Sequence, residues 1–456
     1  DKPCRGVPTT SLMNLPPKEP PFRLPSGAMK FAYTLLCAFT ALSWSASAIP
    51  NAVGGFLAQA DSPLNGTEIG NQLLDPRLWA GERNLPGNWR KEAPIATVAG
   101  SYLAARPTVF GVPAVMVQAR HRSGKLDSLA ITFADAGSYF GYLNEKLPSG
   151  LSRRQQEAEL QRRLTGKQQE FSTFFRQTET SLKEALGDLA DKRPRENQIG
   201  RTRALRAEAI DYRKDDLVLR LLVGGERLIR LLIQPAGSAT RGWLDPDRTA
   251  LSGSALGRVY QDRVTRTDNG DVRIDSLPIV PQGYKPYCGL NTLTMAARYF
   301  GLHLDEDWLA VAGKFQNTGS AAGSQIPRLY LAVAREAGLD LHKSNTFSLD
   351  EARGSLDRGL PVVVWRRFSA GRNTVHTRQT IQSSQDPGFR IPIPDTTTRD
   401  SWPDDKAPLH ASVIVGYNAT RQEVLFVESW AGMDIPRRMR TEEMSATAYL
   451  TFYFKR

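Results

Sequence analysis

The grouping of apolar residues predicts two β-hairpins in the first half of the chain. Four segments alternate polar and apolar residues or run apolar with many β-branched side chains, and a short turn sequence separates the members of each pair. The segments are VPAVMVQARH (112–121) with LDSLAITFAD (126–135), and LVLRLLV (217–223) with RLIRLLI (227–233). Gly224 and Gly225 supply the second turn, where glycine accepts the backbone angles that tight hairpins require.

A long helix is predicted between the two hairpins, from Ser152 to about Asp191. Ser152 followed three residues later by Gln155 is a capping box, which satisfies backbone groups at a helix start. Apolar residues then recur with mostly helical spacing at Leu160, Leu164, Phe171, Phe174, Phe175, Leu182 and Leu186. Hairpins and a helix together predict a small α+β domain without a recognisable catalytic set. His121, at a hairpin end, is expected to be an ordinary surface residue.

The second half of the chain opens with helices and closes with strands. After a strand-like segment, VRIDSLPIV (272–280), a helix is predicted to begin at Cys288 and to end at Gly301. Further helices are expected at about 306–315, 325–337 and 349–358, and strands in PVVVWRRF, HASVIVGY, EVLFVESW and AYLTFYF. A polar loop, 369–407, is expected within this strand region. Helices followed by an antiparallel sheet predict an α+β domain whose two layers pack together.

The expected domain boundaries follow changes in composition. Residues 244–271 are rich in Asp, Arg, Ser and Gly with little periodicity, which indicates a linker. This interpretation places an N-terminal α+β domain of undetermined role at 49–243 and a second domain at 272–456. A chain of 456 residues is long enough to form two hydrophobic cores.

The first 48 residues are interpreted as two segments that precede the folded protein. Residues 1–28 begin with Asp and contain seven prolines, which indicates a non-native or disordered leader. From Met29 there follow a basic residue, a short apolar run and a small-residue pattern that ends at Ala48. This order is typical of a secretory signal peptide, 29–48. We therefore expect an exported protein, periplasmic or extracellular, with no stable membrane span in the mature chain from Ile49.

The charge of the chain does not indicate a nucleic-acid partner. The whole sequence has 59 Lys and Arg against 47 Asp and Glu; without residues 1–48, which hold five and two of these, 54 and 45 remain, a net charge of +9. The richest stretch, Arg153 to Arg213, mixes Arg with Glu, as on a solvated helix surface. Export also argues against nucleic acid.

Cysteine usage directs attention to one residue. Of the three cysteines, Cys4 and Cys37 fall in the two segments expected to be absent from the mature chain, which leaves Cys288 alone. A single cysteine in an exported protein cannot form an intramolecular disulfide and is exposed to oxidation. A buried apolar role would explain the residue, but a nucleophile at a helix start is the alternative that its surroundings favour.

Two residues downstream supply candidate partners for this thiol. His410 begins one predicted strand and Glu428 ends the next, and each lies nine positions from a turn centred near Ala419. In an antiparallel hairpin these two residues would lie opposite each other. The loop residues Asp395 and Asp404 are alternatives to Glu428 as the carboxylate. The other histidines are weaker candidates, His376 for want of a strand and a downstream carboxylate, and His303 and His342 as surface residues at element ends.

The chemistry of this set is nucleophilic attack on a carbonyl carbon. The attacking species is a thiolate, and both a helix N-terminus and a nearby imidazolium lower the pKa of a cysteine. Acyl transfer also needs donors for the developing oxyanion. The backbone N–H of Cys288 and the side-chain amide of Gln282, six residues upstream, are the candidates. The sequence has no metal-ligand cluster and indicates no cofactor.

Gln282 and Cys288 at a helix start, followed by LHASVIVGY and then VESWAG, resemble the papain-like cysteine peptidases. The helix with MAARYFG and the lack of disulfides resemble most the bacteriocin-processing (peptidase C39-like) type found in exported bacterial proteins. The resemblance covers 272–456. It implies a papain-like fold in which Cys288 is the nucleophile, His410 the general base and acid, and Gln282 the oxyanion-hole amide.

Glu428 is the main departure from the family pattern. The resemblance implies an orienting Asn or Asp at this position, and glutamate is one methylene longer. Trp430 resembles the family tryptophan that shields the orienting hydrogen bond from water.

Two functions from different classes follow. The first is an exported cysteine peptidase acting on a peptide or protein through a thioester acyl-enzyme. The second is a non-catalytic peptide- or protein-binding module on the same fold. The N-terminal domain is expected to be either a binding module or a pro-region that blocks the cleft. The sequence does not indicate an oligomeric state.

Overall fold

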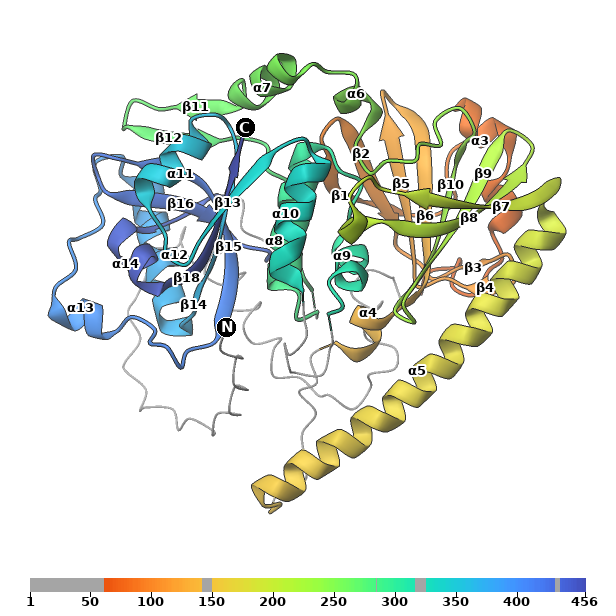
Figure 1. Cartoon of the computed structure of the whole chain (residues 1–456), viewed down its shortest axis with the longest axis horizontal. Coiled ribbons are helices and arrows are strands. Elements are labelled where there is room, and N and C mark those ends of the chain that lie inside the picture. Colours follow the sequence, from red (N-terminus) through yellow and green to blue (C-terminus); the bar gives the residue numbers. More distant parts are fainter. Residues whose placement is uncertain (1–60, 142–149, 284, 316–324, 431–434) are drawn as a thin grey trace.

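The computed structural model describes residues 61–141, 150–283, 285–315, 325–430 and 435–456. The expected leader (1–28) and signal peptide (29–48) lie outside these residues. The described part contains two large antiparallel β-sheets and a set of helices between them (Figure 1). Mixed helices and antiparallel sheets confirm the predicted α+β class.

The first sheet has the strand order β1-β2-β5-β6-β10-β9-β8-β7. Its strands are β1 (Trp89–Ile95), β2 (Val98–Leu103), β5 (Met116–Arg122), β6 (Lys125–Asp135), β7 (Lys192–Ile199), β8 (Ala207–Lys214), β9 (Leu217–Gly224) and β10 (Leu228–Pro235). Both predicted hairpins are confirmed, since β5 pairs with β6 and β9 with β10. Short elements flank this sheet: α2 (Gly70–Leu73), α3 (Pro76–Ala80), β3 (Thr108–Val109), β4 (Val112–Pro113), α4 (Ala136–Phe140) and the 3-10 turn η2 (Arg203–Leu205).

The predicted long helix is α5 (Arg153–Leu189), and its capping box is present. Ser152 accepts a hydrogen bond from the Gln155 backbone, while the Gln155 side chain accepts one from the Ser152 backbone. The C-terminal part of α5 packs its apolar side chains, Phe171, Phe175, Leu182 and Leu186, into the core on one face of the first sheet. The N-terminal part of the helix extends away from the sheet (Figure 1).

The two faces of the first sheet differ in chemistry, as the alternation along β10 shows. Ile229, Leu231 and Ile233 belong to the core shared with α5. On the opposite face, Leu228 packs into the other core of the molecule, and Arg230 pairs with carboxylates on that side. Because strand side chains alternate between faces, this pattern leaves the sheet buried on both sides.

The second sheet has the path β11-β12-β15-β14-β18-β13, with β16 added to β15 and β17 to β16. Its strands are β11 (Val264–Arg266), β12 (Asp271–Ile274), β13 (Asp340–Ser344), β14 (Val362–Arg367), β15 (Leu409–Asn418), β16 (Glu423–Val427), β17 (Arg437–Arg440) and β18 (Ala448–Lys455). The helices are α8 (Cys288–Phe300), α9 (Glu306–Ala312), α10 (Ile326–Glu336), α11 (Leu349–Leu356), α12 (Ala370–Gln385), α13 (Thr396–Asp400) and α14 (Thr441–Thr447). The helices predicted before the sheet are therefore present.

Helices α8, α9 and α10 form a layer between the two sheets (Figure 1). Helix α8 contacts β14 and β15 of the second sheet and β1 of the first, while α9 contacts β10. The main core joins residues of both sheets around α8, including Leu228, Leu293 and Val413. Burial of apolar surface on both sides of α8 explains why nearly every residue of this helix is buried.

Two segments contain more regular structure than their sequences indicated. Residues 244–271, interpreted as a linker, contain α6 (Pro246–Thr249), α7 (Gly253–Gln261) and β11, which pairs with β12. Residues 369–407, expected to be a polar loop, contain α12 and α13, so this expectation was wrong. Helix α12 buries mainly polar side chains, which are Arg372, Asn373, His376 and Thr380. Apolar periodicity cannot reveal a helix of that kind.

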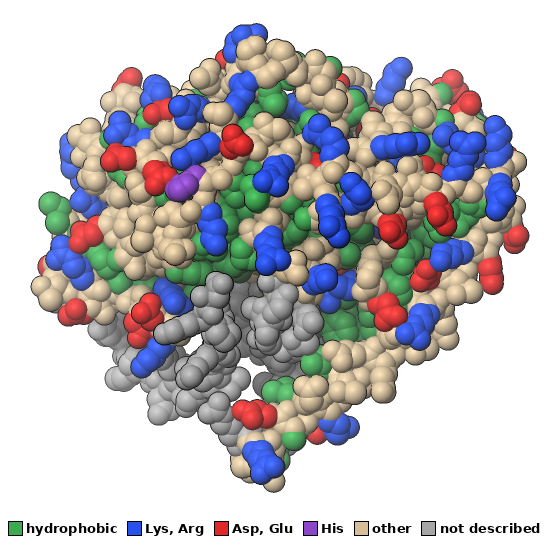
Figure 2. Space-filling view, in the orientation of Figure 1, with side chains coloured by type: hydrophobic (Ala, Val, Ile, Leu, Met, Phe, Trp, Pro, Cys, Tyr) green, Lys and Arg blue, Asp and Glu red, His purple; other side chains and the backbone are tan. Residues whose placement is uncertain are grey.

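The described surface is mixed in charge. On the face shown in Figure 2, Lys and Arg side chains are spread over both sheets, with Asp and Glu among them. No helix among the described residues is long and apolar enough to cross a membrane.

Candidate active site

Cys288 is the first residue of α8, where helical backbone N–H groups lack partners in the preceding turn. Its side chain is partly exposed. The next residue, Gly289, lies against the ring of Trp365 on β14, and a Cβ there would be 2.9 Å from that ring. Glycine at this position lets the start of α8 lie close to the second sheet, which brings the thiol to the end of β15.

His410 lies between Cys288 and Glu428. Its side chain lies beside the thiol of Cys288, where each group shifts the pKa of the other. Its Nε2 lies 2.6 Å from Oε2 of Glu428, which leaves Nδ1 as the ring nitrogen for the thiol. The imidazole stacks on Trp430, with 4.9 Å between ring centroids and 24° between planes. The structure therefore brings together the predicted cysteine, histidine and carboxylate, with the tryptophan beside them.

The register of β15 and β16 differs from the one expected. Val413 pairs with Val427, and continuing by one residue places Glu428 opposite Ser412, two positions from His410. Residues 419–422 form the turn, so its centre lies beyond Ala419, which alone would place Glu428 opposite Val413; a bulge between Ile414 and Gly416 shifts the register back by one residue. His410 and Ser412 share a face of the strand, so Glu428 reaches the histidine diagonally.

Glu428 is held by several donors besides His410. Its Oε1 accepts a hydrogen bond from Nη2 of Arg366 at 2.8 Å, and its Oε2 accepts one from Oγ of Ser412 at 2.9 Å. Nη1 of Arg437 lies 3.8 Å from Oε1. Arg366 also donates from Nε to Oγ of Ser412 at 3.1 Å. The carboxylate is buried, and its charge is balanced by buried cations, as a stable buried carboxylate requires.

The surroundings shift the pKa values of all three groups. Burial raises the pKa of the Cys288 thiol, but the neighbouring His410 outweighs this and brings the pKa below its ordinary value. Burial lowers the pKa of His410, while the Glu428 carboxylate and Cys288 raise it to about 9. Burial raises the pKa of Glu428, but His410 and the two arginines lower it to about 2. These shifts favour a thiolate beside an imidazolium.

Gln282 lies beside the residue that follows Glu428. Its backbone N–H donates to the carbonyl of Ser429 at 2.9 Å, and its Oε1 accepts from Oγ of Ser429 at 2.9 Å. The oxygen end of the amide is thereby held by Ser429. Sequence reasoning named Gln282 but missed Ser429, Ser412, Arg366 and Arg437.

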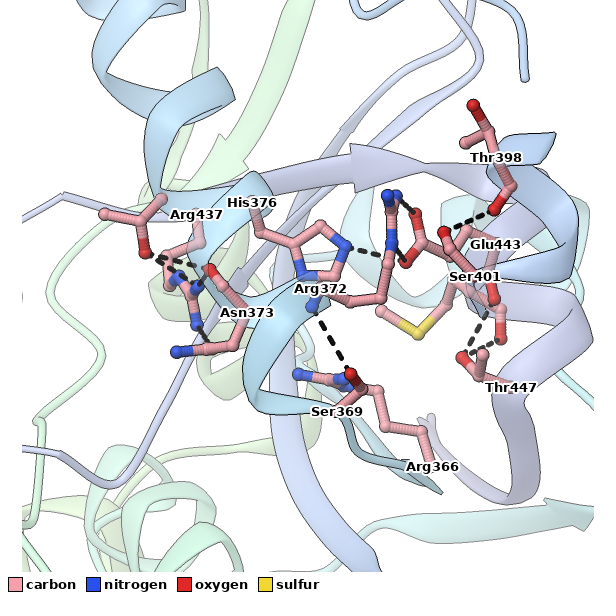
Figure 3. Close-up of polar contacts among 12 residues, drawn as sticks. Arg366, Ser369, Arg372, Asn373, His376, Thr398, Ser401, Arg437, Glu443 and Thr447 are labelled. Atoms are coloured by element: carbon pink, nitrogen blue, oxygen red, sulfur yellow. Dashed lines mark hydrogen bonds and ion pairs between the residues drawn. The ribbon is translucent and has the colours of Figure 1, made fainter. Parts of the chain in front are cut away.

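A second histidine has a carboxylate partner, contrary to expectation. Nε2 of His376 lies 2.8 Å from Oε1 of Glu443, and Arg372 binds the same carboxylate (Figure 3). The expectation that His376 lacks a carboxylate was wrong, because α14, which carries Glu443, was not predicted. His376 is buried, and burial lowers its pKa. The one free cysteine of the described residues lies beside His410, so the His376 cluster lacks a thiol nucleophile.

The remaining candidates lie away from the thiol. Asp395 accepts from the backbone of Thr398, and Asp404 from that of Lys406, and both are exposed. His303 lies 3.4 Å from Asp245, and His342 lies 3.2 Å from Glu351. In the part of the chain that the structure describes, no group of three or more His, Cys, Asp or Glu residues could hold a metal ion.

Comparison with known proteins places this site within a recognised family. Residues 274–454 match the model of the family described as Peptidase_C39 like family. A crystal structure described as a C39-like peptidase from Bacillus anthracis is 17% identical, covering 41% of this chain and 98% of that chain, with a TM-score of 0.27. No curated protein matches the chain.

The peptidase domain of Streptococcus ComA, a bifunctional ABC transporter involved in a quorum sensing pathway, is 15% identical. This match covers 39% of the present chain and 96% of that chain, with a TM-score of 0.24. These TM-scores are too low to establish a shared fold, so the family assignment depends on the family model. That model includes Cys288, His410, Glu428 and Gln282 and leaves out the first sheet.

Proposed function

We propose that the C39-like, papain-like domain of residues 274–454 is an active cysteine peptidase that hydrolyses a peptide or protein. The observation that carries this proposal is the position of His410, which lies beside Cys288 on one side and hydrogen-bonds with Glu428 on the other. A nucleophile, a base and an orienting group in contact are the arrangement that acyl transfer requires.

The reaction begins from the thiolate of Cys288 and the imidazolium of His410. The thiolate attacks the scissile carbonyl carbon, and a carbon–sulfur bond forms while the carbonyl electrons move to oxygen. His410 then gives its proton to the leaving nitrogen, the carbon–nitrogen bond breaks and the amine product departs. The neutral imidazole takes a proton from water, which attacks the thioester and releases the acid and the thiolate.

Three groups support this reaction without forming bonds to the substrate carbon. Glu428 holds Nε2 of His410, so that Nδ1 points to the thiol. The backbone N–H of Cys288 and Nε2 of Gln282 are the donors assigned to the oxyanion. Donors of this kind act on charge that develops in the transition state, and removing one typically lowers kcat by about 10²- to 10³-fold.

The setting proposed for this activity is outside the cytoplasm. It is supported by the signal-peptide pattern of residues 29–48, which precede the described residues. Processing would remove Cys37 together with this segment and leave Cys288 as the mature thiol.

Replacement of Cys288 tests the proposal directly. In the mature chain from Ile49, the variant Cys288→Ala should show no labelling by a thiol-directed inactivator and no hydrolysis of a mixed peptide library, while His342→Ala at an exposed position should behave as the wild type. Hydrolysis that persisted in Cys288→Ala would exclude the assignment. A non-catalytic binding module on the same fold would instead have a thiol that stays unreactive below about pH 8.

A further inference from the structure

The first sheet contacts the residues directly before Cys288. Nζ of Lys285 lies 2.8 Å from Oδ2 of Asp135, which ends β6, and 2.6 Å from Oδ1 of Asp307 on α9. The side chain of Lys285 is 14% exposed, and the two carboxylates are 5% and 3% exposed. The buried ammonium group of Lys285 thus links the segment before Cys288 to β6 of the first sheet and to α9.

Asp135 also stabilises the start of helix α4. Its carboxylate caps α4 by accepting hydrogen bonds from the backbone N–H groups of Gly137 and Ser138. Tyr287, which directly precedes Cys288, packs against this turn, and a Cβ on Gly137 would be 2.2 Å from its Oη. Tyr287 is itself buried. The end of β6 and the start of α4 therefore form a support for the residue before the nucleophile.

Other contacts of the first sheet lie on the helix layer. Nη2 of Arg298 on α8 donates to Oε1 of Glu92 on β1 at 2.8 Å, and its Nη1 donates to the carbonyl of Ala93 at 3.0 Å. Arg230 on β10 pairs with Asp305 and, at 3.6 Å, with Asp307. These contacts lie on the side of α8 and α9 that faces the first sheet, away from the side that faces β15. A pro-region that blocks the cleft would instead contact the His410 side.

We propose that the first sheet is a permanent part of the catalytic unit and that Asp135, through Lys285, positions the residues leading to Cys288. This inference rests on the proposed peptidase function. Asp135 is a positioning residue, because it acts on the nucleophile through Lys285 and Tyr287 and does not contact the reacting atoms.

The physical argument concerns a buried charge and a short connection. Lys285 faces Asp135 from the first sheet and Asp307 and Glu306 from α9, with Tyr287 beside it. Removing the Asp135 charge takes away one of the two carboxylates in contact with a buried ammonium, which is strongly unfavourable. Lys285 lies three residues before Cys288, so a shift of Lys285 moves the thiol relative to His410. A displacement of about 1 Å can lower the rate roughly 10²-fold.

The variant Asp135→Asn in the full chain separates positioning from folding. Asparagine is as good a helix cap as aspartate, so the variant removes the charge and keeps the cap. We expect kcat/KM to fall by about tenfold or more, mainly through kcat, and the rate of Cys288 alkylation at neutral pH to fall with it. Asp191→Asn, which removes an exposed carboxylate bound to Lys214 elsewhere on the first sheet, is the matched control and should behave as the wild type.

Substitution of Lys285 tests the same ion pair from its other side. Lys285→Gln should give a similar loss, and the double variant should lose little more than either single variant, because both changes remove the same pair. If Asp135→Asn does not fold, Lys285→Gln carries the same expectation. Wild-type rates in both single variants, or losses that simply multiply in the double variant, would overturn the inference.

The positioning role of Asp135 and Lys285 can be tested even if the chain proves not to be a peptidase. If the wild-type chain hydrolyses nothing, the peptidase assignment fails, but the alkylation rate of Cys288 still reports whether Asp135 and Lys285 position the thiol. A lower melting temperature with an unchanged alkylation profile against pH would show that the pair is only structural and would also overturn the inference.

Discussion

Glu428 reaches His410 diagonally across the β15–β16 hairpin, at 2.6 Å between Oε2 and Nε2, from a position opposite Ser412. Diagonal neighbours on a sheet face are roughly 7–8 Å apart, a span that long side chains bridge. The longer side chain of glutamate spans this diagonal. The departure from the family pattern at position 428 is compatible with an orienting role.

Shortening or neutralising Glu428 should lower activity for different reasons. Glu428→Asp keeps the charge but withdraws the carboxylate from the histidine, whereas Glu428→Gln keeps the length and removes the charge that raises the pKa of His410. We expect kcat/KM to fall by roughly 10²-fold or more in both, the lower range of what general acid–base catalysis contributes. Steady-state kinetics on a library-derived peptide measure this effect.

The two variants differ in their second readout. Glu428→Gln should also shift the alkylation profile of Cys288 to higher pH, because the imidazolium that lowers the thiol pKa becomes less stable. Wild-type activity in Glu428→Asp would show that the diagonal reach is not needed, and the orienting role would then pass to another group.

Arg366 should support catalysis through Glu428. It donates to Oε1 of Glu428 and to Oγ of Ser412 and is buried, so its loss leaves the carboxylate with fewer donors. We expect Arg366→Met to reduce kcat while KM changes little, and to reduce stability by about 3–5 kcal/mol because one partner of a buried pair is lost. Arg399→Met, at an exposed pair with Glu442, is the control and should change neither quantity. An unchanged kcat in folded Arg366→Met would contradict the assignment.

The site should be active over a pH window set by Cys288 and His410. The thiol pKa lies below its ordinary value and the imidazole pKa is raised to about 9, so the ion pair is populated between the two. Alkylation of Cys288 should therefore already be fast below about pH 8.5, where an ordinary thiol is slow. Hydrolysis should decline above about pH 9, as His410 loses the proton needed by the leaving amine. An alkylation midpoint at an ordinary thiol pKa would contradict this window.

The same shifts predict how stability depends on pH. The folded-state pKa of Glu428 is lowered to about 2, so its contribution is present above its ordinary pKa and is lost as the pH falls towards 2. The folded-state pKa of His410 is raised to about 9, so its contribution is present below its ordinary pKa and is lost as the pH rises through 9. The free energies of unfolding of the wild type and of Glu428→Gln, measured with denaturant, should differ most between these two pH limits. If the two free energies of unfolding changed in parallel with pH, the predicted link between these pKa shifts and stability would be wrong.

The sequence predicted the elements that carry the site better than the contacts that complete it. The capping box of α5, the start of α8 at Cys288 and the hairpin between His410 and Glu428 all depend on local patterns, and the structure contains them. The register could not be predicted, because the four-residue turn and the bulge near Gly416 leave no clear signal in apolar alternation.

Long-range polar contacts were also beyond sequence reasoning. Arg366 follows a run of valines and resembles any charged residue at the end of a strand, yet it is buried against Glu428, 62 positions away. His376 on α12 and Glu443 on α14 meet across 67 positions of sequence, and α12 buries mainly polar side chains, so apolar periodicity does not predict it. Lys285 and Asp135 are paired by two halves of the chain that were interpreted as separate domains.

Close packing between Gly137 and Tyr287 gives a test of the inter-sheet support that involves no charge. A Cβ at position 137 would be 2.2 Å from Oη of the buried Tyr287, so Gly137→Ala must shift the Tyr287 side chain, next to Cys288, or the turn at Gly137. We expect lower stability by about 1–3 kcal/mol, as for other overpacked sites, together with slower alkylation of Cys288.

The control for this substitution is Gly187→Ala in α5, where the added methyl meets nothing within 4 Å. Alanine there should stabilise the helix by about 0.5–1 kcal/mol and leave alkylation unchanged. Tyr287→Phe removes the hydroxyl that the new methyl would meet, so combining it with Gly137→Ala should recover part of the lost alkylation rate. If Gly137→Ala lowered stability but left the thiol as reactive as in the wild type, the first sheet would support the fold without positioning the nucleophile.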